Sequence, residues 1–213
     1  HVTGVQTCAL PISLRAVGVA EARYYDKALI DKAEQELKRQ YVSRGHYAAE
    51  VITTITPVER NRVAIVFNVD EGQVAKIVQI NIIGNQAFKE GALRDEMQLS
   101  TPNWLSWYTK NDLYSKQKLT ADLESIRSLY LNNGYLEFVI ESTQVSITPD
   151  KKGVYLNINI REGKQYKVAD VKLAGELLGK DEELKKLLTL KQGDVFSSAK
   201  LTASTKAIAD KLG

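Results

Sequence analysis

Two stretches decide the fold of this sequence: EGQVAKIVQINIIGN at residues 71–85 and EGKQYKVADVKLAGE at residues 162–176. They align without a gap at an offset of 91 residues. The matched positions include Glu71 with Glu162, Gly72 with Gly163, and Gly84 with Gly175. Self-similarity at a fixed spacing predicts that the chain is built from copies of one structural unit.

A second pair of stretches extends the repeat outward. YDKALIDKAEQELKRQYVSRGHY at residues 25–47 aligns with YSKQKLTADLESIRSLYLNNGYL at residues 114–136, at an offset of 89. A third copy begins at Phe196, where FSSAKLT resembles YSKQKLT. The sequence therefore predicts one complete copy with a partial copy on each side. The aligned pairs include Leu37 with Ile126, Tyr41 with Tyr130, and Gly45 with Gly134.

Periodicity predicts the elements of the complete copy. A strand beginning near Lys76 places Val78, Ile80 and Ile82 on one face, and helices are predicted over residues 87–99 and 114–131. Two strands follow, joined by the turn TPDKKG at residues 148–153. This order, β-α-α-β-β, predicts an α+β fold in which a three-stranded mixed sheet is covered by two antiparallel helices. The last strand is expected to bury Val154, Leu156, Ile158 and Ile160.

The domain organisation follows from the copies. We expect residues 14–72 to be the C-terminal part of one domain, 73–163 a complete domain, and 164–213 the N-terminal part of a third. The first copy is expected to lack its first strand and first helix, and the last to contain only a strand and two helices. The inter-domain junctions, Glu71-Gly72 and Glu162-Gly163, are short, which predicts limited hinging between domains.

Residues 1–13, HVTGVQTCALPIS, have no helical or strand period and are expected to form no regular element. VTGVQTCALPI resembles the translation of a short-read sequencing adapter, so we interpret this segment as a non-native leader. A natural leader is the alternative. A signal peptide is not indicated, because no basic region precedes an uninterrupted apolar stretch. The one cysteine, Cys8, belongs to this segment.

The composition excludes several function classes. The chain carries a net charge of +3, and no apolar run reaches the roughly 18–20 residues of a membrane-spanning helix. With Cys8 set aside, the sequence offers no Cys-His pair and no metal-ligand pattern, so we expect no catalytic, cofactor or metal site and no enzymatic activity. His46 has Tyr135 as its repeat equivalent, which indicates a packing or surface residue.

The penultimate strand differs between copies. Gly45 precedes Pro57 by 12 residues, whereas Gly134 precedes Pro149 by 15, which predicts a longer strand in the middle copy. The apolar side chains also change phase within that strand. Because strand side chains alternate, one face can hold both sets only if a β-bulge adds a residue between them. The two sets are Phe138 with Ile140, and Val145 with Ile147.

These features resemble polypeptide-transport-associated (POTRA) domains. The likeness rests on the β-α-α-β-β repeat, the Glu-Gly junctions and INIIGNQAF at residues 80–88. RNRV at 60–63, SKQKLTADLES at 115–125 and STQVSITPDKKGVY at 142–155 are similar to assembly factors of the Omp85 family. The resemblance covers residues 24–213, and by family register the three domains would be the second, third and fourth.

The resemblance implies a periplasmic scaffold at the Gram-negative outer membrane, preceding a C-terminal β-barrel that lies outside this sequence. It implies binding of unfolded outer-membrane proteins and accessory lipoproteins by strand addition to the penultimate strand, which is a sheet edge in this family. The alternative is an edge strand that only closes the sheet. The expected partner-binding residues are Phe138, Ile140, Ser142, Gln144, Val145 and Ile147.

Other interpretations stay open. Trp104 and Trp107 form a candidate contact loop, unless the loop folds them over its own domain. Another Omp85-type transporter, of the translocation and assembly module or of two-partner secretion, is an alternative. Nucleic-acid binding is a rival from another class, but we expect no such partner, because the basic residues alternate with acids on what reads as a solvated helix face. Those acids are Asp112, Asp122 and Glu124.

Overall fold

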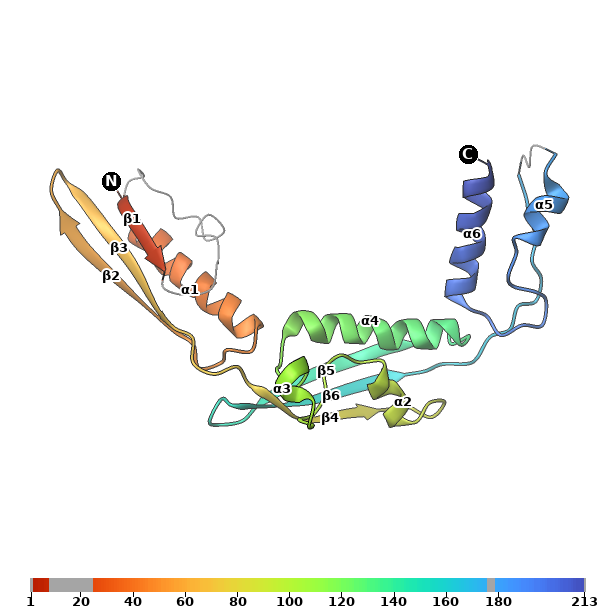
Figure 1. Ribbon diagram of the computed structural model, residues 1–213, viewed down its shortest axis with the longest axis horizontal. Coiled ribbons are helices and arrows are strands. Elements are labelled where there is room, and N and C mark those ends of the chain that lie inside the picture. Colours follow the sequence, from red (N-terminus) through yellow and green to blue (C-terminus); the bar gives the residue numbers. More distant parts are fainter. Residues whose placement is uncertain (1, 8–24, 176–178, 213) are drawn as a thin grey trace. The chain divides into compact units, whose positions relative to one another are not determined.

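The computed structural model describes residues 2–7, 25–175 and 179–212 (Figure 1). Cys8 and the rest of residues 8–24 lie outside the described part of the chain. The α+β fold expected from the repeats is confirmed: helices accompany two three-stranded sheets with the strand orders β1-β3-β2 and β4-β6-β5. The two orders are equivalent, with the last strand of each copy at the centre.

In the first copy, helix α1 (Lys27–Ser43) packs on a hairpin of β2 (Glu50–Val58) and β3 (Arg62–Asp70). The helix begins after Asp26, whose carboxylate accepts a hydrogen bond of 2.9 Å from the Ala28 N–H. The strands are antiparallel and in register from Glu50 opposite Asp70 to Val58 opposite Arg62. The core they share consists of Ile30, Ala33, Leu37, Tyr41, Ala49, Val51, Ile65 and Phe67.

The expectation that residues 1–13 contain no regular element is wrong for β1 (Val2–Thr7), which pairs in parallel with β3. The partial first copy therefore does have a strand in the first-strand position. The physical reason is main-chain pairing, since β3 has β2 on only one side and its other edge offers unpaired N–H and C=O groups.

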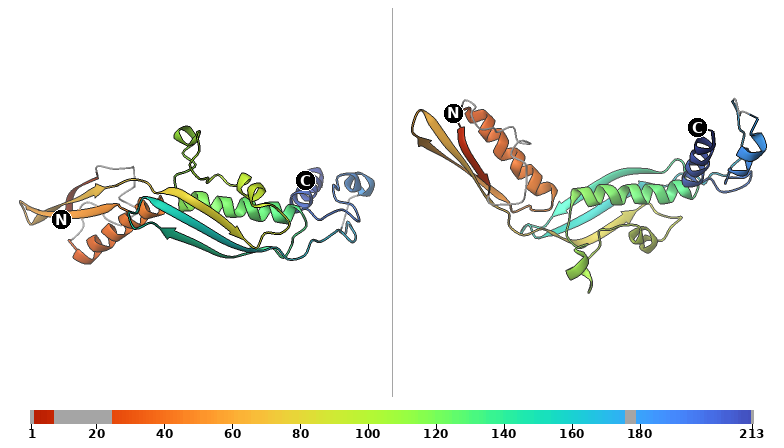
Figure 2. Two further views of the ribbon diagram at one scale, coloured as in Figure 1. Left: turned by 90° about the horizontal axis from the view of Figure 1, so that it is seen from below. Right: turned by 45° about the horizontal axis from the view of Figure 1, so that its top comes forward.

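The middle copy runs through β4 (Lys76–Ile83), α2 (Glu90–Asp95), α3 (Ser106–Thr109), α4 (Lys116–Asn132), β5 (Val139–Ile147) and β6 (Gly153–Arg161). The ribbon views show α4 lying along the sheet (Figures 1 and 2). All four side chains expected on the inner face of β6 are buried, which confirms its predicted phase. The first predicted helix is shorter than expected and spans only α2.

The predicted face of β4 needs one correction. Ile80 and Ile82 are buried as expected, but Val78 is 45% exposed and Ile77 is fully buried. The start of the strand is held by the segment before α4, where the Ile77 N–H donates to the Asp112 carbonyl at 2.7 Å. We attribute the burial of Ile77 to this contact, so the start of β4 does not follow the alternation that buries Ile80 and Ile82.

The predicted difference in strand length is also wrong, because β2 and β5 each have nine residues. Pro57 lies inside β2, opposite Val63, whereas Pro149 lies in the turn after β5. The prolines are therefore not equivalent positions. The middle copy has its extra residues in the hairpin turn, at residues 148–152, where the first copy has only residues 59–61.

Two carboxylates expected on a solvated helix face are buried instead. Asp112 is 3% exposed and precedes α4, while Asp122 is 1% exposed and lies on the inner side of α4. Each is buried with a partner: Asp112 with the Lys76 ammonium at 3.0 Å, and Asp122 with main-chain N–H groups. Only Glu124 matches the expected solvated position.

The last copy contains α5 (Asp181–Lys186) and α6 (Ser198–Leu212). The strand expected near its start is not formed among residues 164–175, where Lys167 makes only an isolated bridge to Val195. A first strand of this fold pairs with the last strand of its own copy, as β1 does with β3. Among the described residues, this segment pairs with no strand of either sheet.

Candidate partner-binding edge and domain junctions

The candidate binding edge is β5, the outer strand in the order β4-β6-β5. Of the residues expected there, Ile140, Ser142 and Val145 are half-buried, while Gln144 and Ile147 are exposed. Within the described part of the chain, these five side chains therefore lie on a strand that has a hydrogen-bonded neighbour, β6, on one side only.

Phe138 is the exception among the expected edge residues. It precedes β5, is 5% exposed, and stacks on Tyr130 with ring centroids 4.2 Å apart and planes 10° from parallel. Its side chain belongs to the core, so a partner on the edge would not reach it. The apolar periodicity could not separate a core anchor from an edge contact.

The outward face of the sheet ties β5 to β6 through side chains. The Asn159 amide donates to the Ser142 hydroxyl at 2.7 Å, and the Arg161 guanidinium donates to the Glu141 carboxylate at 3.0 Å. Two successive residues of β5 thus both contact outward side chains of β6. A bulge at this point would produce that arrangement, and the bulge stays a prediction.

The junction glutamates are each anchored by a tyrosine of the preceding helix. The Tyr41 hydroxyl donates to Glu71 at 3.3 Å, and the equivalent Tyr130 hydroxyl donates to Glu162 at 2.7 Å. Glu162 also accepts from the main chain of Gln86 at 2.8 Å. Burial, together with the Glu162 carboxylate, raises the pKa of Tyr130. The carboxylate therefore ties the end of β6 to α4 and to the loop after β4.

The junction glycines are required by geometry. Gly72 has φ +59° and Gly163 has φ +73°, a region that L-residues rarely adopt. A Cβ on Gly163 would lie 2.6 Å from the Cβ of Glu137. The Glu-Gly pairs of the sequence therefore combine an anchored carboxylate with a turn that only glycine makes without strain.

Sequence reasoning missed a main-chain ladder at each junction. In the first, the Ala75 N–H donates to the Gly45 carbonyl at 2.8 Å, and the Tyr114 N–H donates to the Ala75 carbonyl at 2.9 Å. The second junction repeats the pattern. The Tyr166 N–H donates to the Gly134 carbonyl at 2.8 Å, and the Phe196 N–H donates to the Tyr166 carbonyl at 3.0 Å. The signal was present, since the repeat alignment pairs Gly45 with Gly134 and Tyr114 with Phe196.

The junctions do not coincide with the limits of the compact parts of the chain. Of the described residues, 2–7, 25–79, 101–119 and 146–155 belong to one compact unit, and 80–100, 120–145, 156–175 and 179–212 belong to the other. Each Glu-Gly junction, with its ladder, therefore lies inside one unit.

His46 packs at the first junction. Its ring Nδ1 lies 3.0 Å from the Glu71 carbonyl oxygen, and its ring makes an edge contact with the Tyr41 ring.

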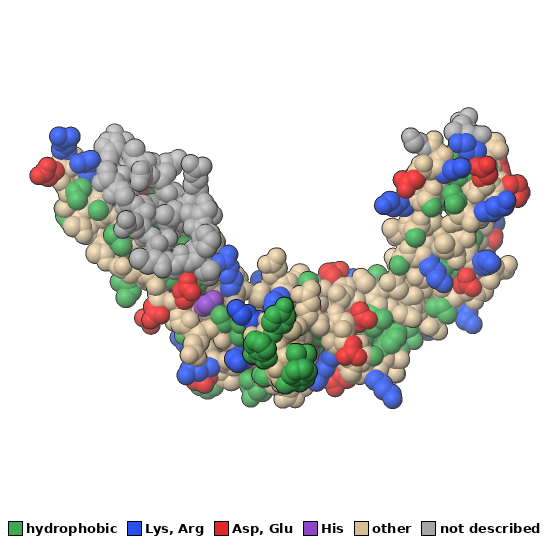
Figure 3. Space-filling view, in the orientation of Figure 1, with side chains coloured by type: hydrophobic (Ala, Val, Ile, Leu, Met, Phe, Trp, Pro, Cys, Tyr) green, Lys and Arg blue, Asp and Glu red, His purple; other side chains and the backbone are tan. Residues whose placement is uncertain are grey.

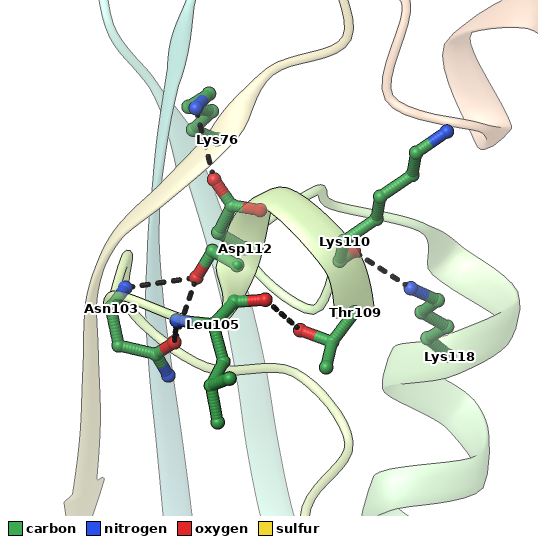
Figure 4. A network of polar contacts seen from close by, with 8 residues as sticks. Lys76, Asn103, Leu105, Thr109, Lys110, Asp112 and Lys118 are labelled. Carbon is green, nitrogen blue, oxygen red and sulfur yellow. Dashed lines mark hydrogen bonds and ion pairs between the residues drawn. The ribbon is translucent and has the colours of Figure 1, made fainter.

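The α3 loop, defined as residues 101–111, exposes its aromatic side chains. Trp104 is 82% exposed and Trp107 is 79% exposed, so the alternative that the loop folds them over its own domain is wrong. The loop is braced by its own polar contacts (Figure 4). The Asn103 amide oxygen accepts from the Leu105 N–H at 2.9 Å, and the Ser106 hydroxyl accepts from the Asn103 N–H at 2.8 Å.

No metal-binding group of three or more His, Cys, Asp or Glu side chains occurs in the described residues. Within the same residues no helix has the length and hydropathy to cross a bilayer. The described buried polar side-chain atoms all have hydrogen-bond partners.

Replacing Tyr130 by phenylalanine is expected to lower the free energy of unfolding by roughly 1–2 kcal/mol, because the Glu162 carboxylate loses the hydroxyl that donates to it. The equivalent change Tyr41→Phe should cost less, since its bond to Glu71 is longer. Urea denaturation followed by circular dichroism measures both. Equal losses would show that the two junction bonds do not differ in strength.

Comparison with known proteins agrees with the repeat. The profile of the family described as POTRA: Surface antigen variable number repeat matches residues 12–72, 75–163 and 166–213. The outer membrane protein assembly factor BamA of Neisseria meningitidis serogroup B is 31% identical over 217 residues, covering 100% of this chain and 27% of that protein. BamA of Buchnera aphidicola is 25% identical over 190 residues, covering 88% of this chain and 30% of that protein.

A solved structure shows the same fold. The crystal structure of Haemophilus influenzae BamA POTRA3-5 matches with a TM-score of 0.55 and 15% identity, covering 98% of this chain and 84% of that one. The present chain spans less than a third of the curated relatives described above. Its repeats, its sheet order and its family match lead to one conclusion: the chain belongs to the POTRA family.

Proposed function

We propose that the chain is the periplasmic scaffold part of an outer-membrane β-barrel assembly factor, and that β5 binds unfolded outer-membrane proteins and accessory lipoproteins by strand addition. The observation that carries this binding mode is the edge position of β5. An edge strand offers N–H and C=O groups that an extended segment can pair with. The named relatives are outer membrane assembly factors, which supports the cellular role.

The side chains along β5 fit this type of client. Strands of outer-membrane barrels alternate apolar and polar residues with a period of two. With the predicted bulge in β5, an added segment would place its apolar side chains next to half-buried Ile140 and Val145, and its polar side chains next to Ser142 and Gln144. Main-chain pairing supplies affinity without reading a particular sequence, so one edge can serve many clients.

The junctions add the scaffold property. Each junction combines a Tyr-Glu hydrogen bond with a main-chain ladder, and both restrain the link between copies. A restrained link keeps a bound client near the C-terminal barrel that the relatives of this family imply. The placement of the three copies as the second, third and fourth domains is part of the same proposal.

Photo-crosslinking tests the location of the site. A photoreactive residue at exposed Gln144 or Ser146 of β5 is expected to give adducts with unfolded outer-membrane proteins in the periplasm. The matched control is Ser128, an exposed position on α4. Adducts at Ser128 in similar yield, or none at β5, would contradict binding at this edge.

Amide hydrogen exchange tests the binding mode. Adding an extended peptide with alternating apolar and polar residues should slow exchange of the outward N–H groups of β5, because each becomes a hydrogen-bond donor to the peptide. The amides of β6, already paired inside the sheet, serve as the internal control. Peptide binding with unchanged exchange along β5 would rule out strand addition.

A further inference from the structure

The α3 loop presents an unusual surface. Four of five successive residues carry large side chains that are exposed: Trp104 at 82%, Leu105 at 42%, Trp107 at 79% and Tyr108 at 77%. In the space-filling view, hydrophobic side chains gather at the surface where α3 lies (Figure 3). A contiguous group of exposed aromatic side chains on a water-soluble surface marks an interaction site more often than a scattered single one does.

The loop holds these side chains in a defined arrangement. Asn103 and Ser106 exchange hydrogen bonds across the start of α3, and the Thr109 hydroxyl donates to the Leu105 carbonyl at 3.2 Å. The Lys118 ammonium donates to the Lys110 carbonyl at 3.1 Å, which ties the end of the loop to α4 (Figure 4). The aromatic side chains therefore need little ordering when they bind.

The charge of the loop has one sign. Residues 101–111 contain Lys110 and no Asp or Glu. The nearest acid along the chain, Asp112, is buried and paired with Lys76 at 3.0 Å. The Lys110 side chain extends away from α3 (Figure 4). A partner thus meets aromatic rings beside a cation, without an exposed carboxylate in the loop.

We propose that the α3 loop inserts into the headgroup region of a phospholipid bilayer. Trp and Tyr rings are amphipathic and favour the interface between headgroups and acyl chains, while a nearby lysine pairs with lipid phosphate. The absence of acidic residues in the loop suits an anionic surface. This contact goes beyond the proposed function, because it requires neither a client nor a lipoprotein.

The sequence provides its own reporter, because Trp104 and Trp107 are the two tryptophans among the 213 residues. Titrating the chain with phosphatidylcholine vesicles that contain phosphatidylglycerol should move tryptophan emission to shorter wavelengths, and the protein should float with the vesicles. Raising the salt concentration should weaken binding, as expected for a contribution from lysine.

Variants assign the effect to the loop. The double change Trp104→Ser and Trp107→Ser is expected to reduce vesicle affinity in flotation by at least about tenfold. Lys110→Glu should weaken binding to vesicles with phosphatidylglycerol more than to pure phosphatidylcholine. Ile52→Ser, at a 62% exposed position on β2, is the matched control for exposed apolar surface and should bind as the parent does.

Three results would overturn the proposal. One is unchanged emission together with no flotation at any lipid concentration. Another is full flotation of the double tryptophan variant. The third is a blue shift that depends on protein concentration and occurs without lipid, which would assign the loop to contact with a second copy of the chain.

Discussion

Replacing Asp122 by alanine is expected to lower the free energy of unfolding by about 3 kcal/mol, one of the two largest effects expected for this chain. The Asp122 carboxylate is 1% exposed and accepts main-chain hydrogen bonds from Gln98 at 2.7 Å and Leu99 at 3.0 Å. Alanine would leave both N–H groups without a partner, and the Leu99 N–H lies in the buried part of the domain. Chemical denaturation monitored by circular dichroism measures the loss.

The last copy supplies a matched variant. Ser204 is the repeat equivalent of Asp122, is 3% exposed, and accepts from the Thr189 N–H at 3.0 Å. Asp122→Ser should therefore keep one of the two bonds and cost less than Asp122→Ala. Glu124→Ala, on the exposed side of the same helix, should change stability by less than about 0.5 kcal/mol. If Asp122→Ala behaved like Glu124→Ala, the buried carboxylate would have no structural role.

Replacing Gly45 by alanine is expected to open the first junction and to cost about 2–3 kcal/mol. Gly45 has φ +92°, and a Cβ there would lie 2.4 Å from the Tyr114 carbonyl oxygen. The clash would displace the ladder in which Ala75 donates to Gly45. Thermal unfolding reports the loss of stability, and amide exchange at Ala75 and Tyr114 reports the local opening.

The control for this change is Gly91→Ala. Gly91 lies in α2 with no atom within 4 Å of an added Cβ, so alanine should be neutral or slightly stabilising there. Amide exchange at Ala75 that stays as slow in Gly45→Ala as in the parent would show that the ladder survives, and would contradict the role assigned to Gly45.

Local pattern was sufficient for the repeated elements. The alternation in β6 identified its buried face. The two repeat offsets, 89 and 91, also imply two extra residues in the middle copy between the helix and the junction. Aligning the two copies on Pro57 and Pro149 placed the extra residues in the strand, whereas in the structure they lie in the turn. The two prolines are not equivalent, because proline is tolerated inside an edge strand and Pro57 lies inside β2.

By itself the sequence determined the α+β architecture, the copies and their order, because periodicity reports the local geometry of helices and strands. The tertiary structure decided which individual side chains are buried or available. Asp122 is buried because Gln98 and Leu99, far away in the sequence, present N–H groups to it, and Phe138 is withdrawn from the edge because Tyr130 stacks on it. Such partners belong to other structural elements, so the periodicity within one helix or strand does not encode them.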